Sequence, residues 1–249
     1  MPTTTAPTVR LAMWSGPRNI STAMMRSFGA RPDAFVCDEP LYAHYLQVTQ
    51  DRRHPGFDET LARHDADWRR VTNWLTGPVP NGATLFYQKQ MAHHLLPNVG
   101  REWINDLTNC FLIRDPWEML TSLIEFIPSP TLADTGLPQQ VELFQSLRIA
   151  TGGFPLVIDA QDVLENPRGM LLAICDSLDI PFYEEMLAWP PGLRETDGAW
   201  APFFYDKVAL TTSFGPYRRK VVELASELRP LLAECNALFE QLAEHRLRM

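Results

Sequence analysis

The chain has 249 residues and a formal net charge of −8, with 30 acidic side chains against 22 lysines and arginines. Its 45% hydrophobic and 21% charged residues exclude global disorder, a collagen-like fibre and a short disulfide scaffold. A chain this acidic is unsuited to non-specific DNA binding, which needs a basic surface. We therefore expect no nucleic-acid partner, and any bound anion must be held by local positive charge.

Five short apolar runs predict β-strands, and most of them are followed by a helical pattern. The strands are expected at residues 9–14, 34–37, 84–89, 109–114 and 155–159, and the helices at residues 21–28, 58–75, 116–126, 139–151, 167–178 and 217–248. Strands that alternate with helices are typical of a parallel sheet covered on both faces. We therefore expect an α/β fold of three layers, with a central parallel sheet and a C-terminal helix.

The N-terminal residues, the lengths of the apolar runs and the cysteines indicate the cellular compartment. Residues 1–8 are rich in Thr and Pro, lack the apolar core of a signal peptide and are expected to be flexible. No apolar run approaches the length of a membrane span, and the four cysteines form no CxxC pair. We expect a single domain over residues 1–249, no membrane association and a reducing cytoplasm. Residues 189–215, rich in Pro, Gly and aromatics, predict a long ordered loop that is a candidate lid.

The turn after the first predicted strand has the composition of an anion-binding loop. Gly16 and Pro17 form the turn, and the next helix opens on Ser21 and Thr22. A helix N-terminus presents free backbone N–H groups and partial positive charge, to which Arg18 adds a full charge. The alternative interpretation is an ordinary serine cap. Because the loop lacks the Gly-Lys-Ser/Thr of an ATP-hydrolysing P-loop, that activity is not expected.

A second strand-to-helix junction carries Arg114 at the end of the fourth predicted strand and Ser122 eight residues later. An arginine at the carboxyl edge of a parallel sheet faces the crevice in which ligands bind, and its paired N–H groups suit phosphate. The alternative is that Arg114 only pairs with Asp115 or Glu118.

Together these segments resemble those of the sulfotransferases that use 3′-phosphoadenosine 5′-phosphosulfate (PAPS). Residues 17–22 are similar to their 5′-phosphosulfate loop, Arg114 with Ser122 is similar to their 3′-phosphate motif, and residues 159–182 give a third match. The three motifs keep the family's order over residues 9–182. The SGPRN-STA and DEPLYAHYL segments resemble a group of bacterial sulfotransferase-like proteins. A similar domain occurs in branched-chain aminotransferase-like proteins, but nothing here resembles a pyridoxal phosphate site.

The resemblance implies a P-loop-like fold, PAPS as the sulfuryl donor, adenosine 3′,5′-bisphosphate as the product and no metal ion. It implies cofactor-binding roles for the following residues: Pro17, Arg18, Asn19, Ile20, Ser21, Thr22, Arg114, Ser122, Arg218 and Arg219. The two late arginines and the adjacent Lys220 are expected at the start of the last helix, as a clamp on the 3′-phosphate. The alternative is an exposed basic turn. The chain departs from the family at Ile20, where the family has Gly, and its C-terminal Gly-rich segment is only a partial match.

Glu39 is the first candidate for the base that takes a proton from the sulfuryl acceptor. It follows the second predicted strand, so it is expected at the carboxyl edge of the sheet beside the first turn. A carboxyl group in a dry pocket has the raised pKa that suits a base. The alternative is that Asp38 or Glu39 caps a helix that begins at Pro40.

Other candidate catalytic residues follow the third strand or lie in the first turn. Lys89 and Arg18 are expected near the sulfuryl group, and His93 or His94 is the second choice of base. His44 is a further candidate for the acceptor pocket. Six aromatic residues are candidates to shape that pocket: Tyr42, Tyr45, Trp200, Phe203, Phe204 and Tyr205.

The function predicted on this basis is transfer of the sulfuryl group of PAPS to a hydroxyl or amine of a small-molecule acceptor. Two rival hypotheses remain open at this stage. One is a kinase-like enzyme with a degenerate P-loop, against which the missing lysine counts. The other is a non-catalytic module that binds adenosine bisphosphate. The sequence predicts neither the identity of the acceptor nor the oligomeric state.

Overall fold

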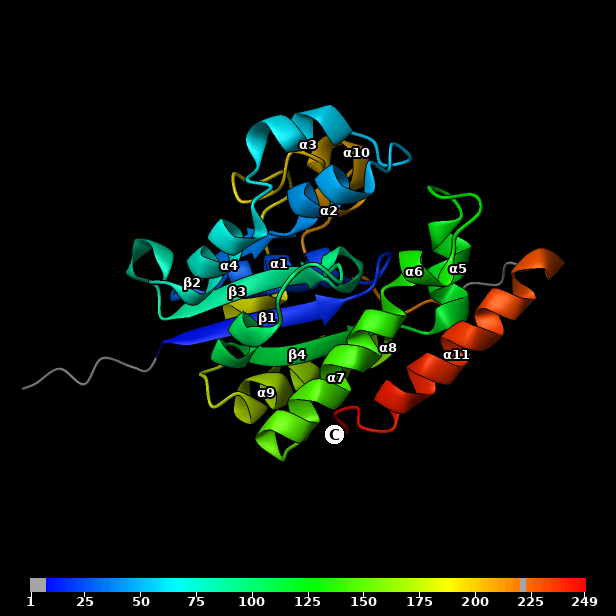
Figure 1. Ribbon diagram of the computed structural model, residues 1–249. Helices are drawn as coiled ribbons and strands as arrows, with labels where there is room; N and C mark the ends of the chain where they lie inside the picture. Colours follow the sequence, from blue (N-terminus) through cyan, green and yellow to red (C-terminus); the bar gives the residue numbers. More distant parts are fainter. Residues whose placement is uncertain (1–7, 220–222) are drawn as a thin grey trace, which may run out of the picture.

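The computed structural model describes residues 8–219 and 223–249, and its centre is a five-stranded parallel sheet (Figure 1). The strands lie in the order β2-β3-β1-β4-β5. Their bounds are β1 Val9–Ser15, β2 Ala34–Asp38, β3 Leu85–Met91, β4 Thr108–Ile113 and β5 Leu156–Asp159. The predicted parallel α/β sheet is therefore confirmed. Three strands run past their predicted ends, to Ser15, Asp38 and Met91.

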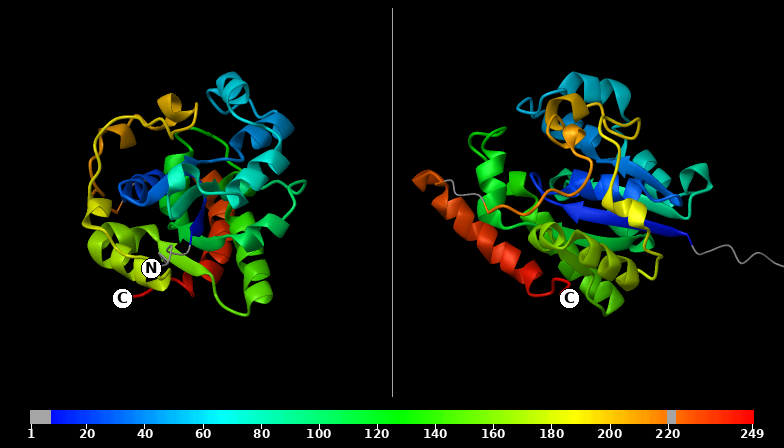
Figure 2. Two further views of the ribbon diagram at one scale, coloured as in Figure 1. Left: turned by 90° about the vertical axis from the view of Figure 1, so that its left-hand side faces the viewer. Right: turned by 180° about the vertical axis from the view of Figure 1, so that it is seen from behind.

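Helices cover both faces of the sheet, as predicted (Figures 1 and 2). Their bounds are α1 Ser21–Gly29, α2 Tyr42–Thr49, α3 Phe57–Arg63, α4 Trp68–Thr76, α5 Pro116–Leu123, α6 Leu132–Thr135, α7 Leu137–Thr151, α8 Ala160–Glu165, α9 Pro167–Ser177, α10 Ala201–Phe204 and α11 Arg229–Ala243. A short 3-10 turn, Ala92–His94, directly follows β3.

Alternation along the strands divides the core into two layers. In β1, Leu11 and Met13 pack with α1, α8 and α9, whereas Ala12 and Trp14 pack with α4, α7 and α11. Residues 11–14 are all fully buried, because successive strand side chains point to opposite faces and both faces are covered. This two-sided burial explains why the strands read as continuous apolar runs in the sequence.

Two helix predictions were wrong in their extent. The expected helix at residues 58–75 is two helices, α3 and α4, because Asp67 starts a new helix by accepting a hydrogen bond from the Arg69 amide. The expected helix at residues 217–248 is also wrong at its start, because α11 begins only at Arg229. Pro230 lies in its first turn, the position that proline tolerates, and would break a longer helix.

Residues 189–215, the segment predicted as a long loop, run from the α1 and α9 layer to α2 and α3 and are called the wall below (Figure 2). Trp189 and Phe214, near its ends, pack with the α1 and α9 layer, while Trp200 and Tyr205 in its middle pack with α2 and α3. A bidentate ion pair from Arg26 of α1 to Asp197 pins this wall, at 2.6 Å for both contacts. Both side chains are almost fully enclosed.

Candidate active site

A cavity of about 370 Å³ lies at the carboxyl edge of the sheet. In a parallel sheet the ends of the strands and the starts of the following helices meet at this edge. Its charged and histidine side chains come from every part of the chain: Arg18, Glu39, Arg53, His54, Lys89, His93, His94, Arg114, Asp134 and Lys207. The cavity therefore brings together the two predicted loop motifs and the candidate bases.

One end of the cavity is built around the N-terminus of α1. Ser21, Thr22 and Ala23 line the cavity, and no side chain caps the helix. The first N–H groups of a helix have no partner within it, and no described group outside the helix accepts from these three. The ordinary serine cap is therefore wrong, because the residue at the cap position is Ile20. The arrangement leaves the N-terminus of α1 open toward the cavity, the geometry that helix termini use to bind anions.

Arg18 lies beside this helix end in a strained backbone conformation, with φ of 55°. Its Nε donates to the Ser122 hydroxyl at 2.9 Å, and its guanidinium group lies 4.4 Å from the centre of the Phe126 ring. It makes no ion pair with a carboxylate of the described residues. Arg18 and Ser122, predicted from separate motifs, thus meet at one end of the cavity.

Arg114 is held at the same end by two kinds of contact. It donates to the backbone carbonyl of Arg18 at 2.7 Å and to Glu118 at 3.0 and 3.2 Å. Glu118 in turn accepts from the Tyr217 hydroxyl at 2.8 Å. Burial and the bond to Glu118 raise the pKa of Tyr217 to about 12. The predicted alternative, an ion pair of Arg114 with Glu118, is therefore present. Arg114 also lines the cavity, so the ion pair does not exclude contact with a ligand.

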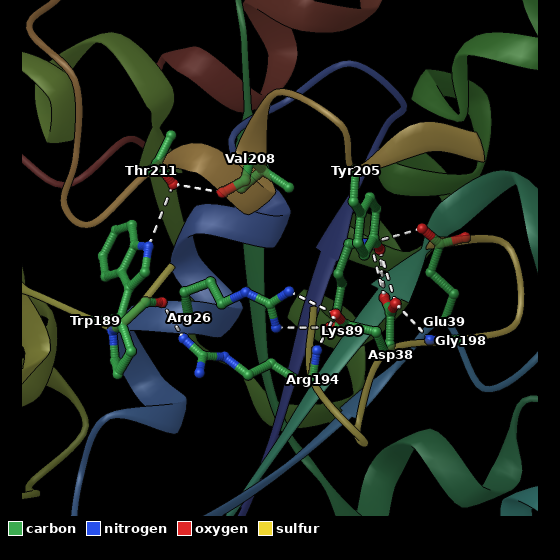
Figure 3. A network of polar contacts seen from close by, with 12 residues as sticks. Arg26, Asp38, Glu39, Lys89, Trp189, Arg194, Gly198, Tyr205, Val208 and Thr211 are labelled. Atoms are coloured by element: carbon green, nitrogen blue, oxygen red, sulfur yellow. Dashed lines mark hydrogen bonds and ion pairs between the residues drawn. The ribbon is translucent and has the colours of Figure 1, made fainter. Parts of the chain in front are cut away.

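The other end of the cavity contains a buried network around Lys89 (Figure 3). Its ammonium group donates to Asp38 at 2.8 Å, to Glu39 at 2.6 Å and to the Tyr205 hydroxyl at 2.6 Å. Tyr205 donates to Asp38 at 2.8 Å, and the Gly198 amide donates to the same carboxylate at 3.1 Å. Since an ammonium group has three donors, all those of Lys89 are engaged within the protein.

Glu39, Lys89 and Tyr205 are the members of this network that line the cavity, whereas Asp38 does not. Burial raises the pKa of Glu39 to about 7, although the neighbouring Lys89 opposes that rise. Its backbone is in the left-handed region, with φ of 41°, and its amide donates to the Lys89 carbonyl at 2.9 Å. Asp38 ends β2, and neither carboxylate caps a helix, because α2 begins at Tyr42 with Leu41 at its cap. The capping alternative is therefore wrong.

Three histidines line the cavity beside Glu39. His94 stacks on Tyr42 with ring centres 4.6 Å apart, and its Nδ1 lies 3.9 Å from Glu39 Oε2. The His93 ring lies 4.2 Å from that of His94. His54 Nδ1 is 2.8 Å from the Tyr42 hydroxyl. Burial lowers the pKa of His93 to about 3 and lowers the pKa values of His94 and His54.

Some predicted residues lie elsewhere. Arg218 and Arg219 are exposed, lie outside any helix and do not line the cavity, and Lys220 lies outside the described residues. His44 is a buried structural residue, because its Nδ1 contacts the Ala66 carbonyl at 3.0 Å and its ring does not line the cavity. Of the six candidate aromatics, four line the cavity and Tyr45 and Phe203 do not.

Sequence reasoning missed four of the charged and histidine residues that line the cavity. One of them, Lys207, lies in the segment predicted as a lid, and the other three lie outside it. Arg53, His54 and Asp134 line the cavity, and Arg53 donates to Asp134 at 2.8 Å. Arg53 and His54 belong to the irregular segment between α2 and α3, and Asp134 to the short helix α6. No motif or periodicity singles out any of them, so the sequence carried no signal for their role.

The fold and the cavity define an α/β protein whose first strand–loop–helix unit presents an uncapped helix N-terminus to a cavity at the carboxyl edge of the sheet. Residues 9–229 match a family model described as "Sulfotransferase domain". Because that match covers most of the chain, the protein belongs to the sulfotransferase domain family.

Two curated relatives come from Arabidopsis thaliana. Branched-chain-amino-acid aminotransferase-like protein 2 is 32% identical over 93% of this chain and 41% of its own length. Branched-chain-amino-acid aminotransferase-like protein 1 is 35% identical over 81% of this chain and 36% of its own length. The chain thus spans only about two-fifths of these relatives.

Solved structures share the fold. The sulfotransferase domain of the Synechococcus PCC 7002 olefin synthase has a TM-score of 0.57 and 15% identity, and covers 97% of both chains. The sulfotransferase domain from the curacin biosynthetic pathway has a TM-score of 0.56 and 17% identity, with 96% and 98% of the two chains covered. In the part of the protein that the structure describes, no helix has the length and apolarity needed to cross a membrane.

Proposed function

We propose that this protein transfers the sulfuryl group of PAPS to a hydroxyl or amine group of a small-molecule acceptor. The observation that carries the proposal is the position of Glu39. A carboxyl group with a pKa near 7 lies in the same cavity as an uncapped helix N-terminus. One end of the cavity thus supplies donors for an anion, and the other supplies a group that can accept a proton at neutral pH.

The end of the cavity at the α1 N-terminus, Arg18 and Arg114 is called the donor end, because it fits the two phosphate-bearing ends of the sulfuryl donor PAPS. The open N–H groups of α1 and the Ser21 and Thr22 hydroxyls would hold the 5′-phosphosulfate. Arg18, Ser122 and Arg114 would hold the 3′-phosphate from the neighbouring junction, with Glu118 keeping Arg114 in place. PAPS would supply an activated sulfuryl group, which needs no further activation by the protein.

Glu39 would act as the base. It accepts the acceptor's proton while the acceptor oxygen bonds to sulfur and the bond from sulfur to the 5′-phosphate oxygen breaks, releasing adenosine 3′,5′-bisphosphate. Two features favour Glu39 over His93 and His94. An imidazole whose pKa is near 3 is a weak base at neutral pH, and a carboxyl group whose pKa is near 7 is matched to the task.

Lys89 would act through Glu39. Its three donors are already engaged by Asp38, Glu39 and Tyr205, so it orients the base and tunes its charge. This differs from the sequence prediction, in which Lys89 contacts the sulfuryl group. We also propose a reducing, cytoplasmic setting, which the four free, buried cysteines support.

The first test is calorimetric titration of the protein with adenosine 3′,5′-bisphosphate, with ATP and magnesium as the comparison. We expect tight binding of the bisphosphate and weak binding of ATP. Binding of ATP alone would overturn the proposal in favour of a kinase-like enzyme. If the bisphosphate binds but no acceptor in a broad panel consumes PAPS, the protein is a binding module and the proposed transfer is wrong.

A further inference from the structure

The charged residues that line the cavity are unevenly neutralised. At the Glu39 end, Lys89 is paired with Asp38 and Glu39, and Arg53 is paired with Asp51 and Asp134. At the other end, Arg18 makes no ion pair within the described residues and lies beside the open helix N-terminus. Lys207, the remaining cation of the lining, pairs with Glu125 at 3.7 Å. Among the described residues that line the cavity, an anionic group would therefore find a cation without an ion pair only at Arg18.

The Glu39 end also contains ring nitrogens that lack hydrogen-bond partners. Nδ1 of His93, Nδ1 of His94 and Nε2 of His54 are enclosed and bond to none of the described residues. His54 Nε2 lies 3.6 Å from Asp51, beyond hydrogen-bond distance. The Nε2 atoms of His93 and His94 are not among these enclosed nitrogens, and both side chains line the cavity. His93 keeps 7% of its surface exposed against 1% for His94, so Nε2 of His93 is the ring nitrogen that a molecule in the cavity can reach. Burial keeps both imidazoles neutral.

An uncharged hydroxyl group is the partner that suits Nε2 of a neutral imidazole. A neutral imidazole offers one donor and one acceptor, and a hydroxyl group can complement either. A carboxylate or phosphate would be desolvated here without a free cation, which is costly. Tyr42 and Trp200 pack edge to face, line the cavity together with Glu39, and suit a compact carbon skeleton.

We propose that this end of the cavity takes an uncharged acceptor with at least two hydroxyl groups, one within reach of Glu39 and another hydrogen-bonded by His93. The proposal rests on the proposed sulfuryl transfer. It makes His93 a specificity-determining residue. It also makes the pairing of Lys89 and Arg53 with two carboxylates each the reason that anionic acceptors are rejected.

The experiment compares two matched sets of three acceptors that differ only at the second substituent. The aromatic set is resorcinol, phenol and 3-hydroxybenzoate. The alicyclic set is cyclohexane-1,3-diol, cyclohexanol and 3-hydroxycyclohexanecarboxylate. Formation of adenosine bisphosphate from PAPS gives kcat/KM for each, and ligand-detected NMR gives binding to the bisphosphate complex. In at least one set we expect the diol to exceed the mono-alcohol by about tenfold, the effect of one hydrogen bond, and the carboxylate to be the poorest.

Two variants assign the preference to one residue. His93→Phe should remove the advantage of the diol, while His245→Phe, a histidine stacked on Phe144 and Phe154 away from the cavity, should retain it. Bisphosphate binding by each variant is the control for folding. If His93→Phe does not fold, the two sets measured on the unaltered protein still decide.

The outcomes separate the two proposals. Equal use and equal binding of diol and mono-alcohol, or a preference for the carboxylate, would overturn the acceptor proposal. So would a diol preference that survives His93→Phe in a variant that binds bisphosphate normally. Failure of the unaltered protein to bind adenosine bisphosphate would instead overturn the proposed function itself.

Discussion

The two ends of the cavity are built in different ways. The donor end uses backbone N–H groups and residues of two contiguous segments, 17–22 and 114–122, each at a strand-to-helix junction. The Glu39 end, called the acceptor end from here on, uses side chains from β2, β3 and the segment before α3, together with residues 198–205. Local sequence therefore builds the proposed anion site, whereas the proposed acceptor site depends on long-range packing.

Backbone strain marks both ends. Arg18 and Glu39 are two of the five described non-glycine residues with positive φ, at 55° and 41°. Such conformations cost free energy and persist only where the surroundings fix them. Arg18 is fixed by the carbonyl contact of Arg114 and by Ser122, and Glu39 by Lys89. Each end thus presents one strained residue whose side chain is aimed by its neighbours.

The largest expected effect is the loss of kcat on replacing Glu39, a change confined to the acceptor end. Glu39→Gln should lower kcat by roughly a thousandfold, because the amide cannot accept the proton, while bisphosphate affinity stays within about twofold. The unaltered enzyme should gain activity as pH rises through about 7, where Glu39 ionises, and the variant should lack that rise. Steady-state rates from pH 5.5 to 8.5 measure both. Equal turnover by the variant would remove Glu39 as the base.

The wall at residues 189–215 provides the next largest effect. Asp197→Asn leaves the buried charge of Arg26 unpaired, so the free energy of unfolding should fall by about 3 kcal/mol. The matched control is Asp206→Asn, an exposed carboxyl in the same wall, which should change it by less than about 0.5 kcal/mol. Urea unfolding measures both. Equal stabilities would show that the ion pair does not anchor the wall.

Arg114→Ala should weaken adenosine bisphosphate binding roughly ten- to hundredfold, the loss of a charge-assisted contact at the donor end. Arg148→Ala, a charge change on α7 away from the cavity, should have little effect. Calorimetry measures each affinity. Arg218→Ala should cost less than Arg114→Ala, because Arg218 is exposed and lies outside the cavity lining. An equal loss would instead support the predicted clamp by Arg218 and Arg219.

The smallest expected effect is on acid stability. The pKa of His93 is lowered by burial to about 3, so between pH 6.5 and pH 5 the unfolded chain binds a proton at this residue that the folded protein does not. Stability should therefore fall as pH falls through this range. The melting temperature of His93→Phe should fall less steeply from pH 7 to pH 5. Parallel slopes would show that His93 is protonated in the folded protein.

The sequence by itself determined the strands and the donor end. Apolar runs of strand length, each near a turn and a helix, were sufficient because both faces of a parallel sheet are buried and the pattern is local. Residues 17–22 and 114–122 likewise act through their own turns and helix starts. The sequence failed at the start of α11, where Pro230 outweighed a long helical pattern.

Only the tertiary structure decided the acceptor end. Tyr205 reaches Lys89 across 116 positions of the chain, and Gly198 reaches Asp38 across 160. His54 enters the cavity from an irregular segment that carries no motif. Burial, which raises the pKa of Glu39 and lowers that of His93, comes from packing of the whole chain and is absent from any local pattern. Side chains that meet through long-range contacts have no fixed separation along the chain. Sequence patterns therefore cannot reveal them, because only folding brings these residues together.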